Sequence, residues 1–156
     1  MIETKESVQH CACTCGESTF QVKNKPKVRF SCHCTICQSL YKQAFANFTV
    51  VPAKDVVLDN AQKIKFSKYR LPPALNRGVC ASCGKPTIAF LHIAPLLKLA
   101  FIPSNTFSDQ ASLPATGGHI FYHSRAQDVV DQLPKISGYW RSEWAVSKAI
   151  MAGLFK

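Results

Sequence analysis

The sequence predicts a mainly β domain, built from small antiparallel sheets and ending in one clear helix. Short runs of alternating, β-branched or aromatic residues recur along the chain, with turn-forming residues between them. Helical periodicity is strong only near the C-terminus. The chain has 156 residues, is 47% hydrophobic and has no low-complexity or linker-like segment. We therefore expect a single domain, residues 1–156, around one core.

The expected strands follow one another closely. Ser18 to Lys23 and Lys27 to Ser31 are separated by Asn24-Lys25-Pro26, which is turn chemistry, so the pattern predicts a β-hairpin. Further strands are expected at Ala44 to Val51, Val56 to Leu58, Lys63 to Phe66, Thr87 to Ile93 and Leu97 to Ile102. Short successive strands with turns between them favour antiparallel pairing.

Three helices are expected: a short one after Cys37, one over Ala126 to Gln132, and the tail from Tyr139 to Phe155. In the tail an apolar stripe at near-helical spacing consists of Trp140, Trp144, Ser147, Met151 and Leu154. We interpret it as the face that docks on the domain's own core. The alternatives are a dimerisation helix or a membrane-surface helix.

Seven of the eight cysteines form three short clusters: Cys13-x-Cys15, Cys32-x-Cys34-x-x-Cys37 and Cys80-x-x-Cys83. Zinc thiolate sites need sulfur atoms that converge on one point, at about 2.3 Å from the metal, and closely spaced cysteines on tight turns provide them. Gly16 and Gly84 follow the two pairs, where a glycine lets backbone amides turn toward the sulfurs. The clusters therefore predict zinc.

A disulfide framework is the alternative, because the cysteine count is even. The N-terminal segment, Met1 to His10, contains no apolar run of the secretory type, and no later stretch is long enough to span a membrane. We therefore expect a reducing, cytoplasmic location, where thiols persist as thiols or metal thiolates.

Seven ligands cannot fill two four-coordinate zinc sites, so the expected division is one closed and one open site. Cys32, Cys34 and Cys37 can bind one Zn²⁺ and leave its fourth position open for chemistry. Cys13, Cys15, Cys80 and Cys83 then form a closed structural site. Cys11 is interpreted as a free thiol rather than a fourth ligand of the triplet. His33, between two ligands, is expected to point away from their metal.

These residues resemble a known family. The resemblance is carried by Cys13-Thr-Cys15-Gly16, Cys32-His33-Cys34-x-x-Cys37, Arg77-Gly78-Val79-Cys80-x-x-Cys83-Gly84-x-Pro86, and His119-Ile120-Phe121 with Ser124-Arg125. Together they are similar to the glutathione-dependent formaldehyde-activating enzymes, a family that includes centromere protein V. The similarity covers a core from about residue 11 to residue 139, before the helical extension at 139–155.

The resemblance implies a zinc-stabilised β-tent fold, like that of the Rab chaperone proteins. It also implies the same partition of ligands, with Cys13, Cys15, Cys80 and Cys83 structural and the triplet of Cys32, Cys34 and Cys37 catalytic. The implied activity is that of a carbon–sulfur lyase, which joins glutathione and formaldehyde as S-hydroxymethylglutathione.

The chemistry of three thiolates agrees with such an activity. A zinc ion with three thiolates is a weak Lewis acid for making hydroxide, but a thiol in its fourth position stays nucleophilic. We therefore expect glutathione or a related thiol, and a small aldehyde, as partners. Candidates for binding the carboxylates are Lys42, Lys68, Arg70 and Arg77, and candidates for a proton shuttle are His119 and His123.

A non-catalytic, zinc-stabilised module that binds nucleic acid or a protein is the rival interpretation. The net charge of +10, from 19 basic and 9 acidic residues, motivates it. The basic residues are spread along the chain, however, and the one cluster, Lys23 to Arg29, reads as the solvated face of a hairpin. No recognition helix or RNA-binding signature accompanies it, so nucleic acid is not an expected partner.

Overall fold

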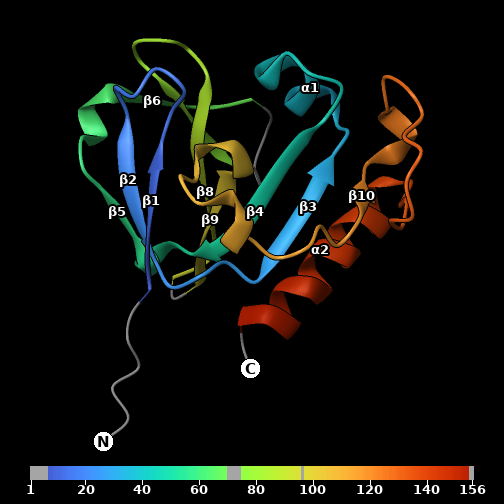
Figure 1. Ribbon diagram of the computed structural model, residues 1–156. Coiled ribbons are helices and arrows are strands. Elements are labelled where there is room, and N and C mark those ends of the chain that lie inside the picture. Colours follow the sequence, from blue (N-terminus) through green and yellow to red (C-terminus); the bar gives the residue numbers. More distant parts are fainter. Residues whose placement is uncertain (1–6, 70–74, 96, 155–156) are drawn as a thin grey trace, which may run out of the picture.

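Strands in two sheets dominate the fold, and two α-helices accompany them (Figure 1). The computed structural model describes residues 7–69, 75–95 and 97–154. The smaller sheet has the order β1-β2-β5, with β1 at Val8–Ala12, β2 at Thr19–Lys23 and β5 at Val56–Leu58. Its strand pairs are antiparallel. The expected fold class, mainly β with a C-terminal helix, is confirmed.

The larger sheet has the order β10-β3-β4-β9-β8-β7-β6. In chain order its strands are β3 (Val28–Cys32), β4 (Ala46–Pro52), β6 (Ile64–Lys68), β7 (Asn76–Cys80), β8 (Pro86–Ala94), β9 (Leu97–Pro103) and β10 (His119–Ile120). Only the pairing of β10 with β3 is parallel among its described strand pairs. That short parallel contact brings the segment after residue 118 beside the triplet of cysteines.

Helix α1 spans Thr35–Tyr41 and α2 spans Tyr139–Leu154. Short 3₁₀ turns lie at Ala53–Asp55, Ala61–Lys63, Ser104–Thr106, Gln110–Ser112 and Tyr122–Ser124. The helix expected after Cys37 therefore begins earlier, because the Cys34 Sγ accepts the backbone N–H of Cys37 and forms the N-cap. Lys42, in the left-handed conformation, ends it.

Two hydrophobic clusters hold the layers together. In one, Phe20 and Val22 of β2 pack with Ile88 and Ile102 of the large sheet, so this cluster joins the two sheets. In the other, β3 and β4 pack against α2 through residues such as Phe30, Val50 and Ile150. Figure 1 shows the consequence: the small sheet lies at one end of the molecule, and α2 lies near β3 and β10 at the other.

The predicted hairpin is wrong, although both of its strands exist. β2 pairs with β1 and β5, whereas β3 pairs with β4 and β10. The buried residues of the two strands belong to different hydrophobic clusters, so the connection through Asn24, which has a positive φ of 69°, carries the chain from one sheet to the other. The residues between the strands do favour a turn, but the hydrophobic cluster that each strand joins determines which strand it pairs with.

Two further expectations are corrected. Residues 126–132 form no helix, because this segment is held by local polar contacts. Arg125 bonds Asp128, and the Tyr122 hydroxyl accepts the N–H of Val129. Helix α2 does dock on the core, but Trp140, Trp144 and Met151 of the predicted stripe are 80%, 71% and 67% exposed. The face that packs consists of Ser142, Val146, Ala149, Ile150 and Leu154.

No helix in the described part of the chain is both long and apolar enough to cross a membrane.

Candidate functional site

Four cysteines from distant parts of the chain converge at the ends of β1 and β7. The Sγ atoms of Cys13, Cys15, Cys80 and Cys83 all lie within 4.8 Å of one another. Cys13 Sγ is 3.0 Å from Cys15 Sγ and 3.5 Å from Cys80 Sγ. A tetrahedral zinc thiolate needs sulfur atoms roughly 3.8 Å apart, so this group fits a metal ion.

Two tight turns, each closed by the N–H of a glycine, form the backbone around this four-cysteine group. The N–H of Gly16 donates to the carbonyl of Cys13 at 2.9 Å, and the N–H of Gly84 donates to the carbonyl of Cys80 at 2.8 Å. Both glycines have positive φ, 81° and 72°, as their sequence positions predicted. The N–H of Ser18 points at Cys13 Sγ at 3.5 Å. Such an amide stabilises a thiolate more than a thiol.

The second group is the three-cysteine group, Cys32, Cys34 and Cys37, which comes from one turn of chain between β3 and α1. Its Sγ atoms also lie within 4.8 Å of one another, so it could hold a metal ion. Cys32 ends the strand, Cys34 caps the helix, and Cys37 lies in its first turn, where its N–H reaches Cys34 Sγ at 3.4 Å. The compactness follows from helical geometry, which places a cap residue and the residue three positions later side by side.

Electrostatics favour a thiolate in the three-cysteine group. Hydrogen bonds from the thiols of Cys32 and Cys37 lower the pKa of Cys34 to about 2, and the positive charge of Arg77 acts in the same direction. Arg77, from β7, also directs its Nη1 at Cys37 Sγ over 3.7 Å. The three-cysteine group is therefore prepared to hold negative charge, as a metal-binding thiolate group requires.

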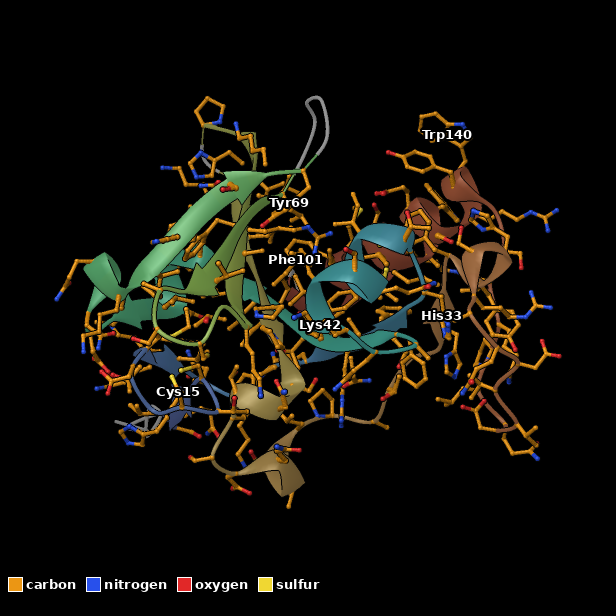
Figure 2. The ribbon with its side chains drawn as sticks, turned by 90° about the horizontal axis from the view of Figure 1, so that it is seen from above. Cys15, His33, Lys42, Tyr69, Phe101 and Trp140 are labelled. Carbon is orange, nitrogen blue, oxygen red and sulfur yellow. The ribbon has the colours of Figure 1, made fainter. Side chains whose placement is uncertain are left out.

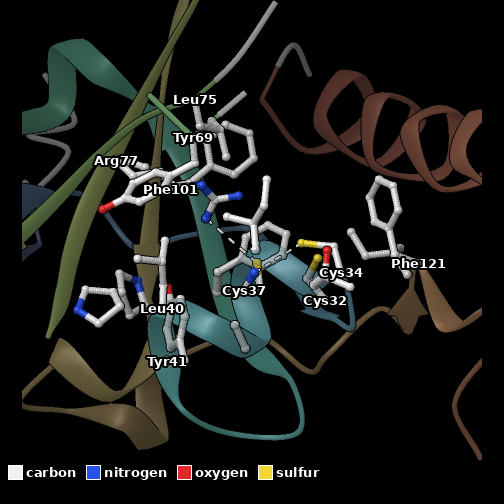
Figure 3. Close-up of a pocket in the computed structure, with 18 of the residues that line it drawn as sticks. Cys32, Cys34, Cys37, Leu40, Tyr41, Tyr69, Leu75, Arg77, Phe101 and Phe121 are labelled. Atoms are coloured by element: carbon white, nitrogen blue, oxygen red, sulfur yellow. Dashed lines mark hydrogen bonds between the residues drawn. The ribbon is translucent and has the colours of Figure 1, made fainter. Parts of the chain in front are cut away.

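A cavity of about 400 Å³ opens on these three sulfurs (Figure 3). Helix α1 and the end of β3 lie on one side of the cavity, strands β7, β8 and β9 on a second, and α2 with the segment after β10 on a third. In Figure 3, Arg77, Tyr69 and Phe101 lie on the sheet side of the sulfurs, and Phe121 lies on the opposite side. A ligand that reaches the sulfurs is therefore enclosed by three layers of the fold.

The four basic residues considered for binding carboxylates differ in their position relative to the cavities. Arg77 lines the cavity of the three-cysteine group. Lys42 borders a second cavity, of about 220 Å³, beside Cys13 and Cys83. Lys68 lines neither of these two cavities. Arg70 lies outside the described residues.

His33 faces away from the sulfurs, as predicted, and belongs to a hydrogen-bonded chain of two buried histidines and Asp131. His33 Nε2 is 2.8 Å from His119 Nδ1, and His119 Nε2 is 2.7 Å from Asp131 Oδ2. The hydrogen bonds from Lys135 and His119 lower the pKa of Asp131, so the carboxylate accepts. His119 therefore donates to Asp131 and accepts from His33, which leaves His33 Nδ1 without a hydrogen-bond partner among the described residues.

The structure also accounts for His119 and His123, the two histidines considered for a proton shuttle. His119 is buried and fully used in the chain to Asp131, and His123 Nδ1 accepts the N–H of Gly138. Neither lines the cavity of the three-cysteine group. The structure therefore does not support direct proton transfer by His119 or His123, the two candidates named from the sequence.

Cys11 lies outside both cysteine groups, as the free-thiol interpretation requires. It is buried in the cluster that joins the two sheets. Burial raises the pKa of its thiol to about 12, against a smaller effect of a hydrogen bond with Thr106. The thiol is therefore neutral and acts as a small core side chain.

Sequence reasoning missed most of the cavity wall. Tyr41, Tyr69, Phe101 and Phe121 come from four separate segments and line the cavity together. Each reads in the sequence as an ordinary core or strand aromatic. Arg77 is the lining residue that the sequence did single out, as a basic candidate just before Cys80.

Comparisons with known proteins agree with this geometry. The fold is similar to the crystal structure of a Rhodobacter sphaeroides protein, with a TM-score of 0.52 and 16% sequence identity, covering 64% of this chain and 87% of that one. At that identity the likeness concerns the fold alone. No curated protein gives a significant match. The family model of the glutathione-dependent formaldehyde-activating enzyme matches residues 8–124, a stretch that contains all seven clustered cysteines. The chain therefore belongs to the glutathione-dependent formaldehyde-activating enzyme family.

Proposed function

We propose that this protein is a zinc-dependent enzyme of the carbon–sulfur lyase type, which condenses or carries a small aldehyde with glutathione or a related thiol. The observation that carries the proposal is the three-cysteine group, one ligand short of a closed site and open to a cavity of about 400 Å³. Family membership supports both the thiol and the aldehyde.

The proposal assigns different roles to the two cysteine groups. Cys13, Cys15, Cys80 and Cys83 would hold a structural Zn²⁺, whereas Cys32, Cys34 and Cys37 would hold the Zn²⁺ of the reaction site. When bound there, zinc supplies a positive centre that keeps an incoming thiol deprotonated and nucleophilic. A reducing, cytoplasmic location belongs to the proposal, because free thiolate ligands persist there.

The chain's own residues orient and protect the reactants. The guanidinium of Arg77 lies against Cys37 and partly offsets the negative charge of three thiolates. Burial raises the pKa of Tyr41, so its hydroxyl stays neutral beside the sulfurs. Apolar residues of β8, β9 and α2 cover the remaining sides and exclude water from the nucleophile.

The first test measures zinc content by elemental analysis, before and after treatment with a mild chelator, with and without glutathione. We expect two zinc ions per chain, one of which is labile and protected by glutathione. Cys11→Ser is the matched control and should retain both ions, because Cys11 belongs to neither group. Two equally inert zinc ions would contradict the open site.

The second test measures reaction. Zinc-loaded protein is mixed with glutathione and aldehyde, and adduct formation is followed by NMR against the uncatalysed rate. Cys37→Ser should remove the acceleration, whereas Cys11→Ser should not. Absence of both glutathione binding and acceleration in the wild-type protein would reject the enzyme proposal and leave the non-catalytic binding module.

A further inference from the structure

We infer that the aldehyde taken by this site carries an apolar substituent about the size of an aromatic ring, and that formaldehyde is too small to use the cavity. This inference deepens the proposed function and rests on it. It is drawn from the walls of the cavity rather than from its cysteines.

The described cavity wall is rich in aromatic side chains and poor in charge. Apart from the three cysteines themselves, its charged lining residues within the described chain are Arg77 and Glu143, one of each sign. Six aromatic side chains contribute to it: Tyr41, Phe48, Tyr69, Phe101, Phe121 and Tyr139. A wall of this composition favours an apolar ligand.

The aromatic side chains form pairs on two sides of the space. The rings of Phe48 and Phe101, from the large sheet, have centroids 5.6 Å apart. The rings of Phe121, which follows β10, and Tyr139, the first residue of α2, have centroids 5.8 Å apart and meet edge to face. A planar apolar group between such pairs can meet both ring faces and ring edges, which stabilises aromatic contacts beyond simple burial.

Charge argues against the peptide part of glutathione lying inside. The chain has 19 lysine and arginine residues, yet a single one of them, Arg77, lines the described cavity, and it is directed at Cys37. Glutathione carries two carboxylates and one ammonium group. Burying a carboxylate without a partner is costly. The thiol's charged ends therefore lie toward the open side, and the apolar interior is left for the group attached to the carbonyl carbon.

Size leads to the same assignment. A volume of about 400 Å³ lies in the range of sites for whole small molecules. Formaldehyde has one carbon atom and would leave most of the apolar wall without contacts. A phenyl-sized substituent fills the space that the sheet and α2 enclose, and its burial stabilises the adduct.

The reaction itself is unchanged by this assignment. The thiol sulfur bonds to the carbonyl carbon, the C=O π bond becomes a C–O single bond, and the proton released by the thiol ends on that oxygen. No electron acceptor or donor is needed. The substituent takes no part in bond making, so the cavity can select it by contact alone.

Two stable thioethers test the inference by binding, without catalysis. S-methylglutathione resembles the formaldehyde adduct, and S-benzylglutathione resembles the adduct of benzaldehyde. Using isothermal titration calorimetry with zinc-loaded protein, we expect S-benzylglutathione to bind about tenfold tighter or more, because an aromatic ring is buried. Equal affinities would overturn the inference.

Three variants locate the effect. Phe101→Ala removes an aromatic ring of the cavity wall that belongs to the sheet. Tyr69→Ala removes a half-exposed ring at the edge of the cavity, and this variant is expected to fold normally. Trp140→Ala is the matched control, since Trp140 is 80% exposed and does not line the cavity. The first two variants should shrink the benzyl preference, and the control should keep it. A preference that all three variants keep would overturn the inference.

Reaction rates separate failure of this inference from failure of the proposed function. Adduct formation is measured with glutathione and either benzaldehyde or formaldehyde, each relative to its uncatalysed rate. Greater acceleration with benzaldehyde supports the inference. Acceleration confined to formaldehyde overturns the inference but leaves the proposed function standing. No acceleration with either aldehyde, together with no glutathione binding, rejects both.

Discussion

At the scale of single residues, Cys11 and Cys13 are close in the sequence but have different roles. It lies two residues before Cys13 on the same segment, yet its side chain packs in the cluster between the sheets while Cys13 joins the four-cysteine group. The alternation of side chains along a strand would put both on one face, but β1 ends at Ala12. The turn after Ala12 therefore directs Cys13 elsewhere.

Cys11 gives a pH-dependent prediction. Folding raises its pKa from 9.0 to about 12. Its contribution to the free energy of unfolding is therefore fully present below pH 9 and is lost as the pH rises toward 12. In that window the unfolded thiol ionises while the folded one cannot. The wild-type protein should lose about 1.4 kcal/mol of unfolding free energy per pH unit relative to Cys11→Ala.

Urea unfolding of both proteins at pH 7.5, 9 and 10.5, with zinc present, measures this difference. The other cysteines are common to the two proteins, so their effects cancel in the comparison. At pH 7.5 Cys11→Ala should be the less stable by about 1 kcal/mol, because a buried sulfur is removed. Parallel pH profiles would show that Cys11 is not buried as a neutral thiol.

The residues of the two cysteine groups could be predicted because their spacing is short. Cys34 and Cys37 meet through one turn of helix, and Cys80 and Cys83 meet through one tight turn, so local geometry suffices. The contact of His33 with His119, and of His119 with Asp131, could not be predicted from local spacing. His119 meets His33 only because β10 pairs with β3, and such a long-range pairing leaves no trace in local spacing.

At the scale of elements, helix α2 shows how a hydrophobic stripe can mislead. The packed face begins with Ser142, whose Oγ accepts the N–H of Phe121 at 2.8 Å. It ends near Gly153, where a Cβ would lie 2.9 Å from Val28 Cγ2. Small residues let the helix approach β3 closely, and the bulky tryptophans face outward. Small residues at the two ends of this face therefore allow the apolar side chains between them, such as Ile150, to reach the core.

Two alanine variants of α2 test this orientation. Ile150 is 8% exposed and packs against β3 and β4, so Ile150→Ala should cost about 2–4 kcal/mol of unfolding free energy. Trp144 is 71% exposed, so Trp144→Ala should change the unfolding free energy by no more than about 0.5 kcal/mol. Urea unfolding measures both. A Trp144→Ala variant as unstable as Ile150→Ala would mean that the predicted stripe is the docking face after all.

Strands were predicted well where the sequence has a run of β-branched and other apolar residues, as for β5, β8 and β9. Strands β1, β7 and β10 were missed. β1 reads Val-Gln-His-Cys-Ala and β7 reads Asn-Arg-Gly-Val-Cys, and neither has a run of β-branched residues. Gly78 of β7 is required because a Cβ there would lie 2.6 Å from Ile64 Cγ2, which is packing information that a single sequence does not contain.

At the scale of the whole molecule, the four-cysteine group connects the two sheets. Cys13 and Cys15 follow β1 of the small sheet, whereas Cys80 ends β7 of the large one and Cys83 follows it (Figure 2 labels Cys15). In Figure 2 the labelled Cys15 and His33 lie on opposite sides of α1, so the two cysteine groups occupy different regions of the fold. A metal in the first group would cross-link the sheets, and one in the second would not.

This difference predicts unequal effects of two matched serine variants. Cys83→Ser removes a ligand of the cross-link and should lower Tm by roughly 10 °C or more, because structural zinc contributes several kcal/mol to folding. Cys34→Ser removes a ligand of the open site, but serine is itself a good N-cap for α1, so Tm should fall by about 4 °C or less. Thermal unfolding followed by circular dichroism gives both values, and elemental analysis should find one zinc lost in each. If the two variants lose stability equally, both cysteine groups are structural, and the open site with its proposed chemistry must be given up.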